Sequence, residues 1–259
     1  MGRRDQRMRW TASEKNRVPA LLPDGRRAIR GITTRDLGVV FQPIVDLSSG
    51  RVRALEALVR CEWEEYRAPP ALFTQAVEEE SVGRLGRLIR EVAFRLADGK
   101  PLFVNIHPAE LSSRWLVRPD DPLCFYDNEV FLEITESATF EHFELCHDVL
   151  VEVCSRTGAH LVVDDLGAGY SNLKRIVDLE PGVVKLDISL VKGLDRNPRQ
   201  QILVHQLVRL AEGLGAQVVA EGIETLDELK AVRDTGAHFG QGYLLARPVY
   251  PSGEVHWPL

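Results

Sequence analysis

The sequence predicts an α/β fold, and a closed (β/α)8 barrel is its best interpretation. Short apolar runs typical of buried strands recur along the 259 residues, with segments of helical spacing between them. From Asn105 onward, the polar ends of these runs lie roughly 20 to 36 residues apart, about one strand–helix unit each. A doubly wound sheet is the main alternative, but it would gather functional residues at one switch point. A barrel instead places them at the carboxyl ends of many strands.

Four apolar runs in the first part of the chain carry carboxylate or amide side chains. They read LEAL at 55–58, LFVN at 102–105, VFLE at 130–133 and LVVDD at 161–165. A carboxylate in a buried strand is costly unless a cation or a hydrogen-bond partner compensates it. Oxygen ligands that converge at one edge of a sheet suit hard divalent cations. The pattern therefore predicts a dinuclear metal site.

The later part of the chain repeats this order of helix, turn, strand and polar end. Three runs, 182–185, 217–221 and 239–241, end on Lys185, Glu221 and Gln241. Apolar residues at helical spacing predict helices within 71–96, 140–153 and 202–214. Gly158, Gly215 and Gly236 each precede an alanine and the next strand, where a glycine can end a helix in the left-handed conformation.

Composition favours one cytoplasmic barrel domain. The length fits such a domain with a short extension, and 44% hydrophobic residues supply a sizeable core. No run approaches the roughly 18 apolar residues of a membrane span, and no apolar signal-peptide core follows the charged start. The four cysteines show no CxxC spacing, so we expect free thiols rather than disulfides or a zinc site: Cys61, Cys124, Cys146 and Cys154.

Charge is divided unevenly along the chain. Residues 1–36 hold ten Lys and Arg against four Asp and Glu, which leaves 22 basic and 34 acidic residues for the remainder. We therefore expect residues 1–30 to form a basic, flexible N-terminal extension and residues 31–259 to form the barrel. A contact of this basic arm with an acidic partner, nucleic acid or a membrane surface is the alternative. The acidic remainder argues against stable nucleic-acid binding.

Eight motifs stand in the order found in EAL-domain cyclic di-GMP phosphodiesterases, and the resemblance runs from about Asp36 to Pro251. The motifs are FQPIV at 41–45, EALVR at 56–60, VNI at 104–106, LEITE at 132–136, DDLGAGYS at 164–171, KLD at 185–187, EGIE at 221–224 and QGY at 241–243. The resemblance implies a modified TIM (β/α)8 barrel whose first strand, at 39–47, runs antiparallel to the rest. It also implies hydrolysis of cyclic di-GMP to linear pGpG.

The resemblance further implies two ions, Mg²⁺ or Mn²⁺. Its metal ligands correspond in this chain to Glu56, Asn105, Glu133, Asp164, Asp165 and Glu221. Asp164 would bridge the two ions. Two metals about 3.5–4 Å apart can clamp the attacking and leaving oxygens of an in-line displacement. A lone strand-end carboxylate is often a loop cap or an ion-pair partner, but that interpretation fits the whole set poorly.

The same resemblance assigns catalytic roles to Lys185, Gln241, Glu56 and Glu221. Lys185 would contact the water or phosphate, and its charge would stabilise the transition state. A structural ion pair with a strand-end carboxylate is the alternative for Lys185. Gln241 would orient the nucleophile or the phosphate, or else be a satisfied buried amide.

Substrate binding is assigned by resemblance to Gln42, Leu58 and Arg60. The planar fork of Arg60 suits a pair of phosphate oxygens, although a surface ion pair is the alternative. Leu58 would pack against a guanine, and a core position is an equal alternative. Glu224 is interpreted as a first-turn helix acid rather than a substrate contact.

Residues 165–171 resemble the loop that couples dimerisation to metal binding in this family, and Glu136 matches the glutamate that anchors it. A helix N-terminal carboxylate is the alternative for Glu136. A homodimer is implied by the resemblance alone. Leu166 stands where the family usually has phenylalanine, and residues 61–70 lack the usual glycine-containing insert. His107 is interpreted as a helix-entry residue rather than a catalytic base.

Three functions compete. The first is an active cyclic di-GMP phosphodiesterase, which fits because every metal ligand that can be placed is present. The second is a catalytically silent cyclic di-GMP receptor. The third is a phosphodiesterase of the same fold that acts on another nucleotide.

Overall fold

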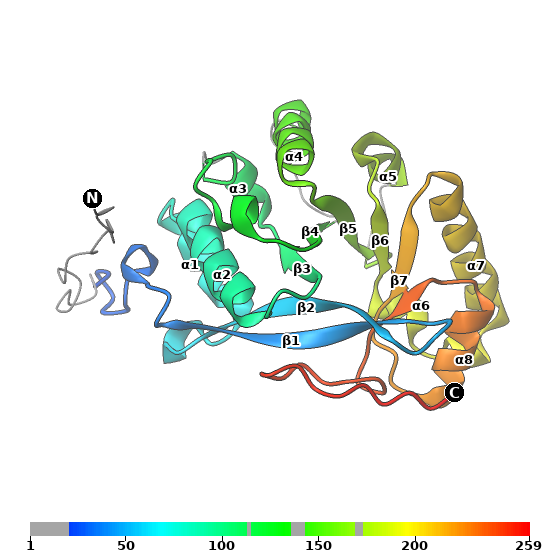
Figure 1. Cartoon of the computed structure of the whole chain (residues 1–259). Helices are drawn as coiled ribbons and strands as arrows, with labels where there is room; N and C mark the ends of the chain where they lie inside the picture. The colour runs from blue at the N-terminus through cyan, green and yellow to red at the C-terminus, as the bar shows by residue number, and fades with distance from the viewer. Residues whose placement is uncertain (1–20, 113–114, 136–142, 169–172) are drawn as a thin grey trace, which may run out of the picture.

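The computed structural model of the chain describes residues 21–112, 115–135, 143–168 and 173–259. Eight strands close into a barrel in the order in which they occur in the sequence (Figure 1). They are β1 Leu37–Asp46, β2 Val52–Cys61, β3 Leu102–Asn105, β4 Val130–Thr135, β5 His160–Leu166, β6 Val183–Leu186, β7 Gln217–Ala220 and β8 Phe239–Gly240. The predicted closed barrel is confirmed, and the open doubly wound sheet is excluded.

The first strand runs against its neighbours. β1 pairs antiparallel with both β2 and β8, whereas β2 to β8 pair parallel with one another. The antiparallel first strand is therefore confirmed. The β1–β8 contact consists of only two residue pairs, Val45 with Gly240 and Asp46 with Phe239. Closure of the barrel thus depends on a short seam.

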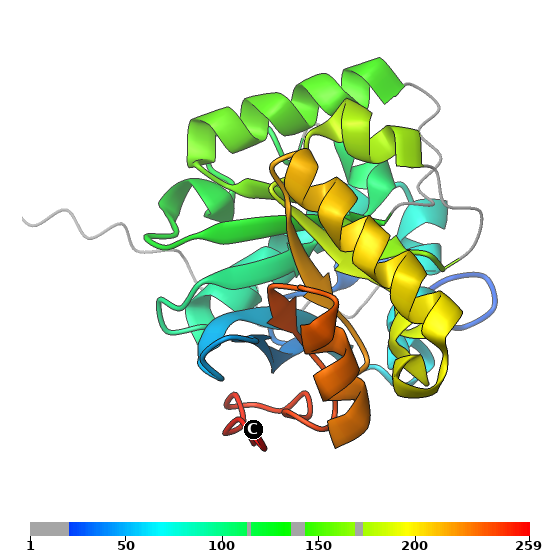
Figure 2. The ribbon, with the colours of Figure 1, turned by 90° about the vertical axis from the view of Figure 1, so that its right-hand side faces the viewer.

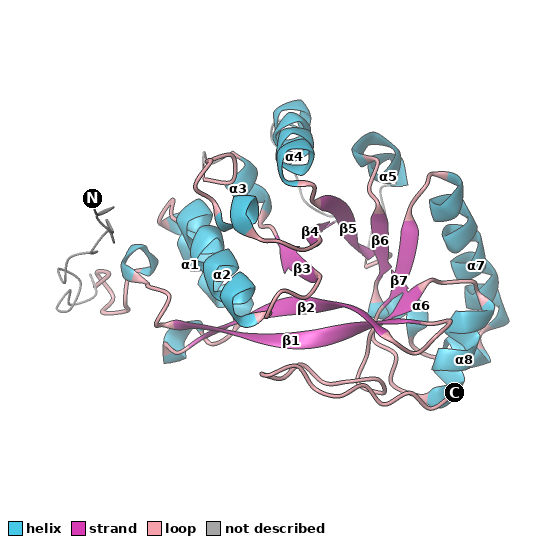
Figure 3. Ribbon diagram, in the orientation of Figure 1, coloured by secondary structure: helices cyan, strands magenta, loops and turns pink. Residues whose placement is uncertain are grey.

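Helices lie outside the strands, as Figures 2 and 3 show for α4 and α7. The α-helices are α1 Pro69–Glu78, α2 Val82–Leu96, α3 Pro108–Leu111, α4 Phe143–Thr157, α5 Leu173–Leu179, α6 Ile188–Val191, α7 Pro198–Gly213 and α8 Leu226–Asp234. Short 3-10 helices are η1 Ile29–Gly31, η2 Glu64–Tyr66, η3 Pro122–Phe125 and η4 Leu194–Arg196. Strands and helices follow one another along the chain in the predicted order.

The helical segment predicted at 71–96 is divided into two helices. Glu80 adopts a left-handed conformation, with φ 52°, between α1 and α2. The chain turns there because the N–H of Ser81 donates to the carbonyl of Ala76, 2.8 Å away. No glycine or proline marks the break, so apolar spacing alone does not reveal it.

The three helix-ending glycines take the predicted conformation. Gly158, Gly215 and Gly236 have φ values of 72°, 84° and 86°. This is the left-handed region, which satisfies the last carbonyls of a helix before the next strand begins. α7 covers the predicted helix at 202–214, with a difference of one residue at its end. The predicted helix at 140–153 corresponds to α4, although residues 140–142 lie outside the described part of the chain.

The barrel interior is apolar at the amino ends of the parallel strands. An inner cluster of buried side chains fills this end: Ile44, Ala54, Phe103, Phe131, Val162, Val183, Val219 and Phe239. The rings of Phe103 and Phe131 stack with centroids 4.2 Å apart. This end of the barrel is therefore filled by apolar side chains, and the polar side chains of the site described below lie at the opposite end.

Residues just before β1 pack against the barrel. Ile29 is fully buried, and its N–H donates to the carboxylate of Glu79 at 2.9 Å. Arg27 forms a paired hydrogen bond with the carboxylate of Glu65 and lies over the ring of Trp63, 4.6 Å from its centroid. The division into an extension at 1–30 and a barrel at 31–259 stays a prediction, because residues 1–20 are not described.

Two expectations drawn from composition can be compared with the described residues. None of the helices described is long and apolar enough to cross a membrane. All four cysteines are free thiols, as predicted.

Candidate active site

Polar side chains from most of the parallel strands meet at the carboxyl end of the barrel. Asn105 is the last residue of β3 and lies in register with Glu133 on β4. Lys185 lies on β6, and Glu221 follows β7 directly. Glu56 differs from the predicted pattern, because it lies in the middle of β2. That strand continues past Glu56 as a hairpin with β1, which the short apolar run does not signal.

The ammonium group of Lys185 is the hub of the cluster. Its Nζ lies 2.7 Å from Oε1 of Glu133 and 2.6 Å from Oε1 of Glu221. It also lies 3.5 Å from Oδ1 of Asp164 and 3.6 Å from Oε1 of Glu56. Lys185 is 1% exposed. One buried cation therefore contacts four of the carboxylates predicted as metal ligands.

Two amides connect the carboxylates to one another. Asn105 Nδ2 donates to Oε2 of Glu133 at 3.0 Å and lies 3.5 Å from Oε1 of Glu56. Gln241 Nε2 donates to Oε2 of Glu56 at 2.6 Å. The other amide atom of Gln241, Oε1, is buried and has no hydrogen-bond partner among the described residues. A buried acceptor without a partner is a place where a bound water or another donor would fit.

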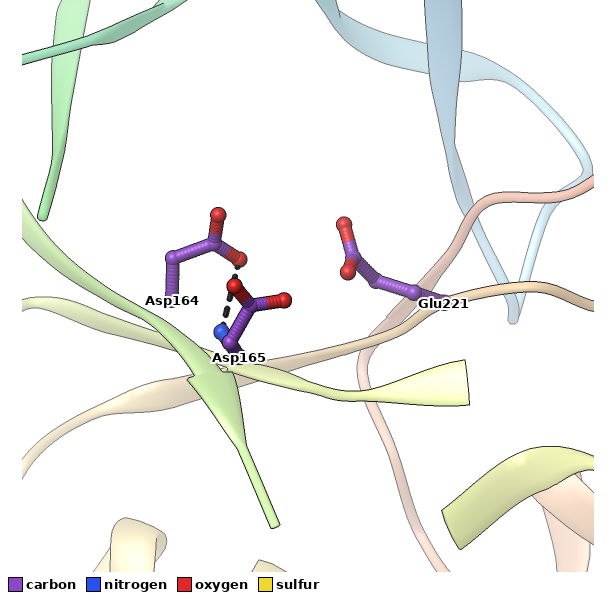
Figure 4. A group of neighbouring side chains, drawn as sticks. All are labelled: Asp164, Asp165 and Glu221. Carbon is purple, nitrogen blue, oxygen red and sulfur yellow. Dashed lines mark hydrogen bonds between the residues drawn. The ribbon is translucent and has the colours of Figure 1, made fainter. Parts of the chain in front are cut away.

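A backbone irregularity brings Asp164 and Asp165 to the same place. Successive side chains of a regular strand point to opposite faces. Here the β5–β6 register shifts between Val163 and Leu166, and Asp165 has φ 59°. As a result, one carboxylate oxygen each from Asp164, Asp165 and Glu221 lie within 4.8 Å of one another, and Figure 4 shows the three side chains together. The N–H of Asp165 also donates to Oδ1 of Asp164 at 2.9 Å. Strained backbone of this kind is often found at functional sites.

Burial and mutual repulsion change the acidity of the cluster. Burial raises the pKa of Glu133 well above its usual value, although Lys185 opposes the shift. Burial also raises the pKa of Glu221 to about 8, and burial with the charge of Asp164 raises the pKa of Asp165 to about 6. For Lys185, burial would lower the pKa, but Glu133 and the other carboxylates outweigh it and raise the pKa well above the usual value.

The donor set fits hard divalent cations. Four carboxylates lie within 3.6 Å of a single ammonium and a fifth, that of Asp165, lies beside them, so full ionisation of the cluster would leave excess negative charge without a bound cation. Carboxylate and amide oxygens are the ligands that Mg²⁺ and Mn²⁺ prefer. Asp164, Asp165 and Glu221 already bring three such oxygens together. The described residues around them therefore have the chemistry of a metal centre.

A cavity of about 340 Å³ opens beside the carboxylates. It is lined by Gln42, Glu56, Leu58, Ile188, Glu221, Gly222, Glu224, Gln241, Gly242 and Tyr243. Two of the side chains that line it, Ile188 and Tyr243, have no role assigned from the sequence, although Tyr243 stands in the motif QGY at 241–243. Their one signal is position, because each lies two or three residues after a polar strand end. Ile188 is 40% exposed and Tyr243 51%, so both present apolar surface to a ligand.

Only two of the three predicted substrate-binding residues line this cavity. Gln42 and Leu58 line the cavity, and Gln42 Nε2 donates to the carbonyl of Ala246 at 3.1 Å. Arg60 is exposed and does not line it; its Nη1 donates to the carbonyl of Val59 at 2.8 Å. Glu136 lies outside the described residues. The roles of these four residues stay predictions.

Known proteins resemble this chain over most of its length. The family model of the EAL domain matches residues 26–248. RocR of Pseudomonas aeruginosa, a cyclic di-GMP phosphodiesterase, is 30% identical over 89% of this chain and 62% of its own length. PdeR of Escherichia coli, also a cyclic di-GMP phosphodiesterase, is 31% identical over 88% of this chain and 36% of its own. The chain thus spans less than two thirds of these relatives.

A solved structure shows the same architecture. BlrP1 of Klebsiella pneumoniae, in a complex with manganese and cyclic di-GMP, superposes with a TM-score of 0.74. The two are 30% identical over 93% of this chain and 60% of the BlrP1 chain. The order of the motifs, the antiparallel first strand and the matched family model agree. The chain therefore belongs to the EAL domain family and is related to cyclic di-GMP phosphodiesterases.

Proposed function

We propose that this chain hydrolyses cyclic di-GMP to linear pGpG. The observation that carries the proposal is the convergence of Glu56, Glu133, Asp164 and Glu221 on one buried lysine, beside a cavity of about 340 Å³. A cluster with this much negative charge would repel a phosphodiester unless cations neutralised it. Membership of the EAL family and the relatives' printed activity support the same reaction.

In this proposal, Glu56, Asn105, Glu133 and Asp164 would hold one metal ion, and Asp164, Asp165 and Glu221 would hold a second. When bound, Mg²⁺ or Mn²⁺ ions supply neutralisation of the phosphate oxygens and acidification of a water molecule.

The chain's own groups do the positioning. Gln241 holds the Glu56 carboxylate through its amide nitrogen, and its buried Oε1 is left to accept a hydrogen bond from the nucleophilic water. Lys185 supplies a fixed positive charge close to where charge develops on the phosphate. The proposed set of catalytic residues also includes Glu56 and Glu221. Gln42, Leu58 and Arg60 form the proposed substrate-binding set, with the Arg60 fork on a phosphate.

A product assay tests the proposal. Purified protein is incubated with cyclic di-GMP and Mg²⁺ or Mn²⁺, and the products are separated by chromatography. We expect pGpG, and we expect Glu56→Ala or Lys185→Ala to lower turnover on the order of 10²-fold or more. Glu91→Ala, an exposed position on α2, is the matched control and is expected to keep full turnover. Unchanged turnover in both site variants would refute the assigned roles.

The same assay separates the other functions. Tight binding of cyclic di-GMP without product would identify a receptor instead of an enzyme. Hydrolysis of a different member of a nucleotide panel would identify another substrate.

We also propose a homodimer, with residues 165–171 as the loop that couples the subunit contact to the metals and Glu136 as its support. The proposal comes from the family resemblance, and light scattering with and without Mg²⁺ tests it. A monomer at all concentrations would contradict it.

A further inference from the structure

The carboxylate of Glu228 joins two separate loops behind the nucleotide cavity. Glu228 lies in the first turn of α8 and is 4% exposed. Its Oε2 accepts the N–H of Glu224 at 3.0 Å and the N–H of Thr225 at 3.1 Å. Its Oε1 accepts the N–H of Gly193, 35 residues earlier in the chain, at 3.0 Å. One side chain therefore satisfies three backbone donors from two loops.

Only part of this arrangement belongs to the helix cap. Thr225 Oγ1 accepts the N–H of Glu228 at 3.2 Å, which with the Thr225 N–H to carboxylate bond forms a capping box. The bond from Gly193 is additional, because Gly193 precedes η4 and has no part in α8. A capping box alone does not require the second carboxylate oxygen. That oxygen is available to fix the other loop.

The two joined loops form one wall of the cavity. Ile188 comes from the segment after β6, and Glu221, Gly222 and Glu224 come from the segment after β7. The two segments touch at Gly222, which has φ 71° and where a Cβ would lie 2.2 Å from Cγ1 of Ile188. The Glu228 bonds hold the same two segments a few residues further along each. The contact between Gly222 and Ile188 and the hydrogen bonds of Glu228 together fix the distance between the two segments.

The bonding keeps Glu228 ionised. Burial acts to raise the pKa of Glu228, but the N–H groups of Gly193, Glu224 and Thr225 outweigh it and lower the pKa. An ionised carboxylate accepts hydrogen bonds at both oxygens, which is what two sets of facing N–H donors require.

We propose that Glu228 is a positioning residue that fixes the spacing between Ile188 and the 221–224 segment and thereby sets the affinity for substrate. The inference rests on the proposed function, because it concerns the cavity assigned there to cyclic di-GMP. Glu228 does not line the cavity, so its effect passes through the loops that it joins.

The substitution Glu228→Gln distinguishes an effect of the carboxylate's hydrogen bonds from an effect of side-chain packing. A glutamine side chain has nearly the same shape, but one of its two terminal atoms is an NH₂ donor. In either orientation this donor would face a backbone N–H, either that of Gly193 or those of Glu224 and Thr225. One set of bonds is then lost, and a partly buried N–H is left without its acceptor.

The test compares Glu228→Gln with two capping variants. Thr225→Ala removes the hydroxyl that caps α8 but keeps the carboxylate bonds to both loops. Asn197→Ala removes the cap of α7, where Asn197 accepts the N–H of Gln200 and lies outside the cavity lining. For each protein, kcat and KM for cyclic di-GMP are measured with saturating Mg²⁺, together with Tm and hydrogen exchange at the amides of Gly193 and Glu224.

For Glu228→Gln we expect KM to rise about 5- to 10-fold with kcat changed less than about 2-fold, as for a loss of uniform binding. Amide exchange at Gly193 or Glu224 should become faster. The two capping variants should lose Tm with KM unchanged. If Glu228→Gln does not fold, Glu228→Asp carries the test: it keeps the charge, is one methylene shorter, and should raise KM with faster exchange at one of the two amides.

Two results would overturn the inference in distinguishable ways. An unchanged KM in the Glu228 variants, with Tm lowered as in the capping variants, would show that Glu228 only stabilises the fold, while turnover by the wild-type chain would leave the proposed function intact. If the wild-type chain neither hydrolyses nor binds cyclic di-GMP, the proposed function fails first and the inference falls with it.

Discussion

At the scale of single residues, the charge balance of the site depends on Lys185. A buried ammonium is costly in isolation, and so is each buried carboxylate. Lys185 is surrounded at 2.6 to 3.6 Å by four carboxylates, so neither partner is left uncompensated. Removing the lysine would leave the acids facing one another across a few ångströms.

This arrangement predicts two effects of Lys185→Ala. Turnover should fall on the order of 10²-fold or more, and without added metal the free energy of unfolding should fall by about 3–5 kcal/mol, as for a broken buried ion pair. Added Mg²⁺ should recover part of the stability, because cations can replace the lost charge, but not the turnover. Chemical denaturation with and without Mg²⁺ measures the first effect.

Lys230→Ala is the matched control, because Lys230 is largely exposed on α8, 3.7 Å from Asp227. It should alter stability by less than about 0.5 kcal/mol. Equal stability losses in both variants would contradict the central role of Lys185.

At the scale of elements, a buried ion network fixes α2 and α3 beside the site. Arg90 on α2 lies 2.8 Å from carboxylate oxygens of both Glu110 and Asp121, and all three side chains are at most 1% exposed. Glu110 also accepts the N–H of His107, two residues after Asn105. The network fits only because α2 has a glycine, Gly86, against the Glu110 carboxylate. A Cβ at Gly86 would lie 2.0 Å from Glu110 Oε2.

Gly86→Ala and Gly213→Ala should therefore have opposite effects on stability. Alanine normally favours a helix over glycine by up to about 1 kcal/mol. At Gly213 of α7 no atom beyond the adjoining backbone of its own helix lies within 4 Å of the added Cβ, so we expect a gain of about 0.5 kcal/mol. At Gly86 the overlap with the network should cost about 1–3 kcal/mol. Denaturant titration measures both, and a stabilised Gly86→Ala would show that the network adjusts freely.

The segment before β1 is attached to η2 by an ion pair that predicts a pH dependence. The hydrogen bond from Arg27 lowers the pKa of Glu65 to about 2 from a usual value of 4.5. A carboxyl whose pKa is lower in the folded state stabilises that state above about pH 4.5, and the contribution is lost as the pH falls toward 2. Because the pair is partly exposed, we expect less than about 1 kcal/mol.

The expected result is that Glu65→Gln is less stable than the wild type at pH 7 and that the difference shrinks as the pH falls below 4.5. Glu64→Gln, at an exposed neighbouring position, should follow the wild type at every pH. If the difference in stability between Glu65→Gln and the wild type instead grew below pH 4.5, the pKa of Glu65 would not be lowered in the folded state.

The sequence predicts the elements better than their local geometry. The polar ends of the apolar runs predict that Asn105, Glu133 and Lys185 lie at one end of the barrel, because the carboxyl ends of parallel strands share one edge. The register shift at Asp164 and Asp165 is not predictable, since two adjacent carboxylates carry no signal of backbone conformation. The antiparallel β1 follows only from the resemblance, because apolar periodicity is the same in either strand direction. Glu228 is missed because its spacing from Thr225 already fits an ordinary helix cap.

At the scale of the whole molecule, the site ties together strands from around the barrel. Its carboxylates come from β2, β4 and β5 and from the residue after β7. A ligand that binds several of them at once stabilises the closed barrel and not the unfolded chain.

We therefore expect Mn²⁺ or Mg²⁺ to raise the midpoint of thermal unfolding and a chelator to reverse the shift. Binding at 100 times the dissociation constant contributes about 2.7 kcal/mol, which corresponds to roughly 5–10 °C for a chain of this size. Differential scanning calorimetry measures the shift. The variant Asp164→Ala should show a much smaller shift, and an equal shift would place the metal elsewhere.

The short seam between β1 and β8 has a consequence for biosynthesis. Gln241 reaches back across 185 residues of sequence to hold Glu56, and β8 contributes only two residues to closure. While the polypeptide is still emerging from the ribosome, every earlier strand can be present and the pocket proposed for catalysis is nevertheless incomplete. The nascent protein thus gains the full set of groups proposed for hydrolysis only after β8 and Gln241 have been synthesised.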